Sequence, residues 1–175
     1  MTRLRLAGVV AAAALGGACV AVFGWTAEAA LGTAACFVLV AVTVTDLERR
    51  VVPNRIVLPA LVAALIVQTV GDPSVEWVAA ALGAGGFFLL AAILHPAGLG
   101  MGDVKLAAFL GAWLGRDVVV ALFVGSLLAF VPAVVLLTLK GSAARKIGLP
   151  YAPFLAAGGV VALFVGGDIV DWWLD

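Results

Sequence analysis

Apolar runs long enough to cross a membrane constrain this chain more than any other feature. A transmembrane helix needs about 20 predominantly apolar residues, and hydrophobic residues make up 65% of the 175 while charged residues make up 11%. Charges, prolines and glycines divide the chain into seven such runs, at 6–25, 29–45, 56–70, 75–94, 104–115, 118–139 and 153–171. The pattern predicts an all-α fold, a polytopic transmembrane helical bundle of six to seven spanning segments.

Little of the chain remains for a soluble domain, so we expect residues 1–175 to form a single integral-membrane domain. Two arginines precede the first run, as in a signal peptide, but apolar character continues to Trp25, which favours a retained first helix. We expect this helix, 6–25, to lie at the periphery of a core at 29–171. Cys19 and Cys36 fall within apolar runs and are interpreted as small buried hydrophobes. The formal net charge is zero, which argues against nucleic acid as a partner.

The distribution of basic residues predicts the orientation of the chain. Cytoplasmic loops of membrane proteins are enriched in Lys and Arg. With a cytoplasmic N-terminus, only Arg116 falls outside, and the inner side collects the other nine basic residues: Arg3, Arg5, Arg49, Arg50, Arg55, Lys105, Lys140, Arg145 and Lys146. Most acids fall on the outer side: Glu28, Asp72, Glu76, Asp117, Asp168, Asp171 and Asp175. We therefore expect a multi-pass protein of the cytoplasmic (inner) membrane whose C-terminus is extracytoplasmic.

Two aspartates stand apart from the other acids. Asp46 ends the second apolar run and Asp103 begins the fifth, so both are expected at the cytoplasmic membrane boundary, on separate helices that can meet. An ionisable residue that faces a bundle at the membrane edge is a functional candidate, because burying its charge is costly. Two carboxyl groups a few ångströms apart hold one proton between them. Such a pair can activate water with one member and polarise a peptide carbonyl with the other, which is the chemistry of aspartic proteolysis.

The glycines around Asp103 have two interpretations. Gly98, Gly100 and Gly102 permit backbone conformations closed to other residues and leave room for a peptide beside the acid. Alternatively, this stretch is only a turn, and Asp103 caps the helix that follows. The other glycine clusters, "LGAGG" at 82–86, "GAWLG" at 111–115 and "AAGGVVALFVGG" at 156–167, are interpreted as close helix packing.

Arg49, Arg50 and Arg55 near Asp46 are interpreted as topology residues, with lipid phosphates or an acidic substrate position as the alternative partner. His95, the only histidine, is interpreted as a loop residue without a role. One histidine and two aspartates make a poor zinc site. We expect no metal and no organic cofactor.

Three motif blocks follow one another along the chain: "DLERRVVPNRIVLP" at 46–59, "GMGDVKL" at 100–106 and "LPYAPFLAAGG" at 149–159. Together they resemble the type IV prepilin peptidases, membrane aspartic proteases of the GxGD class, and the resemblance covers about residues 29–170. It implies that Asp46 and Asp103 are the two catalytic aspartates and that Gly100 and Gly102 are the glycines of GxGD. Six further positions match other motif residues of the family, and the resemblance implies that they shape the site or its substrate entry. They are Pro53, Asn54, Lys105, Pro150, Pro153 and Phe154. Whether Lys105 faces lipid phosphate or assists catalysis stays open.

The resemblance implies cleavage of the basic leader of prepilins or pseudopilins on the cytoplasmic side of an apolar stretch. Many bacterial members carry paired CxxC motifs before the first catalytic aspartate and also methylate the new N-terminus. This chain reaches Asp46 without such cysteines, so we expect peptidase activity without N-methyltransferase activity. Two alternatives remain: a GxGD protease of the signal-peptide-peptidase type, and a proton-coupled transporter that uses membrane acids as a relay.

Overall fold

The computed structural model describes residues 3–95, 99–140 and 149–174 of the chain. Over these ranges the regular structure is helical: α1 (Arg3–Phe23), α2 (Ala27–Arg49), α3 (Asn54–Gly71), α4 (Glu76–Leu94), α5 (Met101–Leu114), a short 3-10 helix η1 (Gly115–Asp117), α6 (Val118–Lys140) and α7 (Ala152–Leu174). Six stretches of helix in the described residues are long and apolar enough to cross a membrane, and one of them, Met101–Leu139, joins α5 to α6 through η1. The predicted helical bundle of six to seven spans is confirmed.

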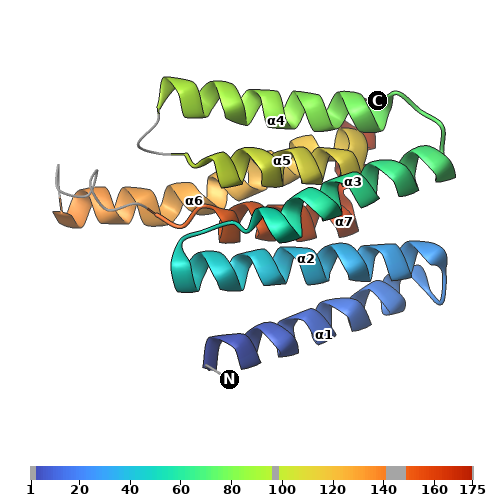
Figure 1. The fold of residues 1–175 in the computed structure, drawn as a ribbon, viewed down its shortest axis with the longest axis horizontal. Coiled ribbons are helices and arrows are strands. Elements are labelled where there is room, and N and C mark those ends of the chain that lie inside the picture. The colour runs from blue at the N-terminus through green and yellow to red at the C-terminus, as the bar shows by residue number, and fades with distance from the viewer. Residues whose placement is uncertain (1–2, 96–98, 141–148, 175) are drawn as a thin grey trace.

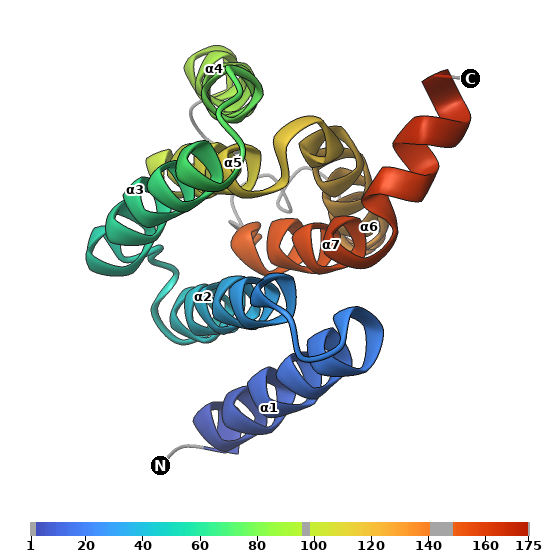
Figure 2. The same ribbon diagram turned by 90° about the vertical axis from the view of Figure 1, so that its right-hand side faces the viewer.

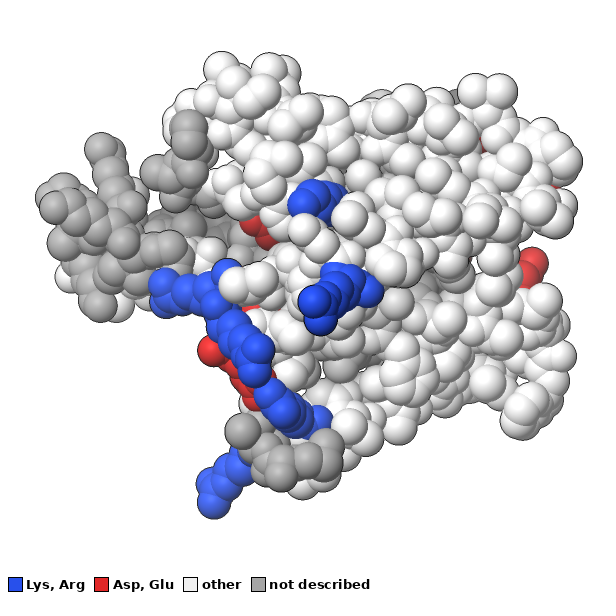
Figure 3. Space-filling model, viewed as in Figure 1, with Lys and Arg blue, Asp and Glu red and all other residues white. Residues whose placement is uncertain are grey.

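The helices lie side by side and alternate in direction along the bundle (Figure 1). One end of the bundle holds the start of α1, the end of α2 and the starts of α3, α5 and α7. We call it the basic end because it carries Arg5, Arg49, Arg50, Arg55 and Lys105, and Figure 3 shows Lys and Arg side chains gathered there. The opposite end, the acidic end, carries Glu28, Asp72, Glu76, Asp117 and Asp171. Arg145, Lys146 and Asp175, which also entered the charge count, lie outside the described residues.

α7 lies at the centre of the bundle, between α2 and α5. A Cβ atom at Gly159 would approach the side chain of Leu110 on α5 to 2.6 Å and that of Leu39 on α2 to 3.3 Å. α2 and α5 each pack against both α3 and α7, whereas α1 packs against α2 at the margin of the bundle (Figure 2). The core that fills the space between these helices includes Val42, Val57, Leu106, Phe109 and Leu155.

Several glycines allow the helices to approach backbone to backbone. A Cβ at Gly111 would collide with the carbonyl of Ala80 on α4, and one at Gly158 would collide with the carbonyl of Ala121 on α6. The packing interpretation is confirmed for these positions. It is wrong for Gly83 and Gly86 in the first cluster, where a Cβ would meet nothing within 4 Å.

Polar contacts tie the helices together at the acidic end. The Gln68 side-chain amide donates to the carbonyl of Trp113 at 2.6 Å and so links α3 to α5. The backbone N–H of Arg116 donates to Glu76 at 2.8 Å, and the Arg116 guanidinium pairs with Asp171 at 2.6 Å. The one basic residue expected on the outer side is thus paired with acids from α4 and α7.

Candidate active site

Asp46 lies in the last turn of α2. The helix continues to Arg49, four residues past the predicted end at residue 45, because polar residues at a membrane edge do not interrupt helical hydrogen bonding. It stops at Arg50, whose φ of 53° and ψ of 42° place it in the left-handed region and whose N–H donates to the Asp46 carbonyl at 2.7 Å. Few non-glycine residues adopt this conformation, and those that do often lie at functional sites.

The Asp46 side chain faces the beginning of α7. It is 7% exposed, and it interacts with the backbone N–H of Ala152, the first residue of that helix, and with the charge of Arg50. The unpaired N–H groups at a helix N-terminus favour a nearby negative charge. One carboxylate oxygen, Oδ2, is buried and has no hydrogen-bond partner among the described residues. That oxygen is available to a water molecule or to a second carboxyl group.

Asp103 lies in the first turn of α5 and is 8% exposed. Its Oδ2 accepts a hydrogen bond from the N–H of Gly100 at 3.0 Å, so the residue caps its own helix. The capping part of the second interpretation is confirmed, whereas Gly102 lies within α5 rather than in a turn. The capping bond does not exclude a chemical role. A carboxylate fixed by a cap presents its other oxygen in a defined direction.

The two aspartates interact with each other. Asp46 contributes to the electrostatic environment of Asp103, and among the described residues these two are the only buried charged side chains. They are 57 residues apart along the chain, and the packing of α2 and α5 against α3 and α7 brings them to one end of the bundle. Two buried carboxyl groups that interact electrostatically are the kind of pair that can share a proton.

The structure corrects the explanation given for the glycines beside Asp103. Neither Gly100 nor Gly102 has a positive φ, and Gly100 is extended at φ −90°, ψ 155°, a conformation open to any residue. Gly102 is needed for a different reason, since a Cβ there would lie 2.6 Å from the Cβ of Val52. The space beside Gly102 is therefore filled by the α2–α3 loop of the protein itself. Gly98 lies outside the described residues.

The other motif residues join α3 to α5 next to this loop. Pro53 is the N-cap of α3, and its carbonyl accepts from the N–H groups of Ile56 and Val57 at 3.0 and 3.1 Å. The ammonium group of Lys105 donates to the side-chain oxygen of Asn54 at 2.8 Å. This contact gives Lys105 a structural partner and draws the start of α3 toward the start of α5.

Tyr151 is a site residue that sequence reasoning missed. Its hydroxyl lies 2.9 Å from the Ser126 hydroxyl on α6, its ring centroid lies 5.9 Å from that of Phe88 on α4, and it interacts electrostatically with Asp103. Burial raises the pKa of the Tyr151 phenol above its usual value, so the hydroxyl is neutral and can donate a hydrogen bond at physiological pH. The only signal was its place in the third block, immediately before Ala152.

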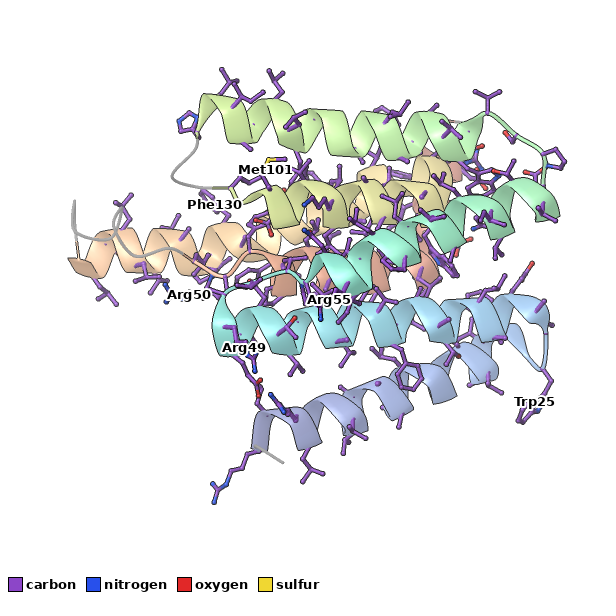
Figure 4. The ribbon with its side chains drawn as sticks, viewed as in Figure 1. Trp25, Arg49, Arg50, Arg55, Met101 and Phe130 are labelled. Carbon is purple, nitrogen blue, oxygen red and sulfur yellow. The ribbon has the colours of Figure 1, made fainter. Side chains whose placement is uncertain are left out.

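The remaining candidates are not among the residues that the structure shows interacting with the acid pair. Arg49 and Arg55 are exposed at the basic end (Figure 4). His95 is exposed at the C-terminus of α4. Pro153 follows Ala152 in the first turn of α7, where a proline needs no hydrogen-bond partner. In the described part of the chain no three His, Cys, Asp or Glu side chains are grouped as metal ligands.

The fold and the site define a class, a polytopic helical membrane protein with a buried aspartate pair at one end of its bundle. The sequence model of the type IV leader peptidase family matches residues 33–138, a range that contains both aspartates. The chain belongs to this family.

Characterised relatives are similar over most of the chain. A prepilin leader peptidase/N-methyltransferase of Bacillus subtilis is 39% identical over 145 residues, which cover 78% of this chain and 56% of the relative. The proteins of the same name from Aeromonas salmonicida and Burkholderia pseudomallei are 34% and 33% identical, over 87% and 90% of this chain and 54% and 53% of their own length. The chain thus spans about half the length of the relatives it matches. No solved structure shows a significant match.

Proposed function

We propose that the protein is a membrane aspartic endopeptidase that removes the basic leader peptide of type IV prepilins or pseudopilins. The observation that carries this proposal is the pair of buried, interacting carboxyl groups of Asp46 and Asp103 on separate helices. Membership of the type IV leader peptidase family supports the same reaction. A proton relay would need further acids along a path through the bundle, whereas the other described acids lie toward its two ends, with Glu48 paired to Arg5 at the basic end and the rest toward the acidic end.

The pair hydrolyses a peptide bond without forming a covalent bond between enzyme and substrate. The ionised carboxylate takes a proton from water as the water oxygen attacks the scissile carbonyl carbon, and the protonated carboxyl group donates its proton to the carbonyl oxygen. Collapse of the resulting gem-diol returns a proton to the carboxylate pair and delivers one to the leaving nitrogen, which departs as an amine. The buried Oδ2 of Asp46, which has no described partner, is a suitable acceptor for the attacking water. The two carboxyl groups supply both acid and base, so the reaction requires no metal or organic cofactor.

The surrounding residues hold the acids in place. Asp103 is fixed by the Gly100 N–H, and Asp46 by its contact with the start of α7. Gly102, Pro53, Asn54 and Lys105 set how closely the α2–α3 loop and the start of α3 approach α5, and Pro153 helps to start α7. These are positioning roles. We assign the chemistry to the two aspartates alone.

The proposed orientation places the site at the cytoplasmic face of the inner membrane. The basic end carries six Lys and Arg residues whose side chains are described, Arg3, Arg5, Arg49, Arg50, Arg55 and Lys105, and the acidic end carries Arg116, which is paired with acids. The positive-inside rule then puts the N-terminus and both aspartates on the cytoplasmic side and the C-terminus outside. α1 lies outside the catalytic core, at the margin of a single membrane domain, with lipid around it.

A substrate panel tests the function. The purified protein in proteoliposomes is incubated with a type IV prepilin, a pseudopilin precursor and a released secretory signal peptide, and the products are identified by mass spectrometry. We expect cleavage of the first two between the basic leader and the apolar segment. Cleavage of the signal peptide within its apolar segment, with both pilin-type precursors intact, would support an intramembrane protease of the signal-peptide-peptidase type instead.

A further inference from the structure

A groove with a volume of about 560 Å³ lies between α4 and α6, which stand apart on either side of α5 (Figure 2). Its walls are almost entirely apolar and are formed mainly by Ala80, Gly83, Ala84 and Phe87 of α4 and by Leu122 and Phe123 of α6. Phe87 and Phe123 are exposed. In a membrane-spanning bundle this surface faces the lipid phase, from which an apolar segment can enter it.

The side chain of Tyr151 connects the groove to the aspartates. Ser126 lines the groove, and its hydroxyl is hydrogen-bonded to that of Tyr151. The Tyr151 ring packs on Phe88, the neighbour of the groove residue Phe87, and Tyr151 interacts with Asp103. Tyr151 therefore contacts both helices that form the groove and interacts electrostatically with one acid of the pair.

We propose that the α4–α6 groove docks the apolar helix that follows the cleavage site in the substrate, and that Tyr151 lies at the junction between this helix and the aspartates. This inference rests on the proposed function, because it identifies the part of the prepilin that the groove receives. The occupant is a transmembrane peptide helix rather than a lipid chain.

The direction and length of the groove fit this occupant. Ser126 lies at the groove's end nearest the aspartates, and Arg116 lies at its other end, next to the acidic end of the bundle. Val118 to Ser126 covers about 12 Å along α6, or roughly two helical turns. A substrate whose leader is at the cytoplasmic face and whose apolar segment crosses outward follows the groove in this direction.

The α4 wall fits a helix more closely than a flexible acyl chain. Ala80 and Ala84 are four residues apart, and Gly83 lies beside them on the same wall. Small residues at this spacing let a second helix approach closely. A Cβ at Gly83 would meet nothing within 4 Å of the protein itself, so this position is open to an incoming helix.

A matched pair of substitutions in α4 tests the groove. Gly83→Leu fills it, whereas Gly86→Leu adds the same side chain to a position that is equally open but does not line the groove. We expect Gly83→Leu to raise the KM for an intact prepilin about tenfold, because the added side chain overfills the contact with the substrate helix. Gly86→Leu should leave KM near the wild-type value. Equal thermal unfolding midpoints of the two variants show that folding is unaffected.

Photocrosslinking tests the occupant directly. A photoreactive benzophenone amino acid is placed at Phe123, or at the exposed Ile66 of α3 as a control, in a full-length Asp103→Asn protein that holds substrate without cleaving it. We expect prepilin adducts from position 123 and none from position 66. Lipid adducts alone at position 123, or equal KM values for both leucine variants in a preparation that cleaves prepilin, would overturn the groove proposal and leave the proposed function intact. Failure of the wild-type protein to cleave any pilin-type precursor would contradict the proposed function itself.

Discussion

Gly100 and Gly102 flank Met101 in the same motif, yet the structure uses them differently. Gly102 lies against Val52, whereas the nearest atom to a Cβ at Gly100 would be the Asp103 carboxylate at 3.5 Å, an ordinary contact. Substitutions at the two positions therefore distinguish the effect of close packing against the α2–α3 loop, which only Gly102 makes, from the effect of losing a glycine.

We expect Gly102→Ala to destabilise the protein and Gly100→Ala to be tolerated. A Cβ at position 102 would lie 2.6 Å from that of Val52, and overpacking of this kind costs about 1–3 kcal/mol. Thermal unfolding in detergent measures the difference as a fall of several degrees in the midpoint of the Gly102 variant. Equal midpoints for the two variants would contradict the role given to Val52.

Lys105 is the residue whose role the sequence left open, and its hydrogen bond to Asn54 predicts a structural role. Lys105→Met removes this bond and should cost about 0.5–1.5 kcal/mol of stability. Asn54→Asp keeps an acceptor and adds an ion pair, so its unfolding midpoint should match or exceed that of the wild type. A catalytic Lys105 would instead give a Lys105→Met protein of normal stability with a greatly reduced kcat.

At the scale of elements, the short α5 determines where the acid pair lies. Its 14 residues extend about 21 Å, less than the roughly 30 Å of a hydrocarbon core. Contacts from Gln68 and Glu76 hold the end of α5 and the turn that follows it at the acidic end. Asp103, at the start of α5, is therefore recessed into the bundle, where it interacts electrostatically with Asp46.

Helix contacts that depend on glycine should be sensitive to a single methyl group. At Gly158, where α7 meets α6, a Cβ would collide with backbone atoms that cannot rotate away. We expect Gly158→Ala to lower the unfolding midpoint by several degrees or to prevent folding. Gly86→Ala, at an open position on α4, should leave the midpoint unchanged or slightly higher because alanine restricts the unfolded chain. If both variants unfold at the wild-type temperature, the backbone contact between α6 and α7 is not as described.

Some features of the helices and of the site could be predicted from the sequence, and others could not. Apolar runs mark membrane helices strongly, so the helix positions were predicted to within a few residues, and charge asymmetry placed Asp46 and Asp103 at one end. A sequence alone does not show which loop fills the space beside a glycine. The contact of Gly102 with Val52 and the approach of Tyr151 to Asp103 therefore needed three-dimensional coordinates. For the same reason Gly83 and Gly86 were grouped with the packing glycines, although nothing packs against them.

The orientation of the whole molecule can be tested from its two ends. Trp25, 96% exposed between α1 and α2, lies at the opposite end of the bundle from Arg49 (Figure 4). We expect Trp25→Cys to react with a membrane-impermeant maleimide in cells with a permeabilised outer envelope, and Arg49→Cys to react only after the inner membrane is opened. Cys19 and Cys36 are completely buried, as predicted, so their background labelling should be low. The reverse labelling pattern would contradict the cytoplasmic placement of the aspartates.

The names of the relatives include an N-methyltransferase activity, which can be tested on the whole molecule separately from leader cleavage. We propose that residues 1–175 contain the peptidase site, and within these residues no paired CxxC motif precedes Asp46. Incubation of the purified protein with a prepilin and labelled S-adenosylmethionine should give a cleaved but unlabelled product. Label on the new N-terminus would contradict this division of activities.

The central claim is that Asp46 and Asp103 act together in peptide hydrolysis. The most direct measurement is cleavage of a prepilin by wild-type, Asp46→Asn and Asp103→Asn proteins in proteoliposomes, followed by intact-mass spectrometry. Asparagine has nearly the shape of aspartate but cannot carry the shared proton, so we expect each single variant to fold normally and to lose at least about a hundredfold in rate, as expected when general acid–base catalysis is removed. Wild-type rates of leader removal by either folded variant would contradict the account.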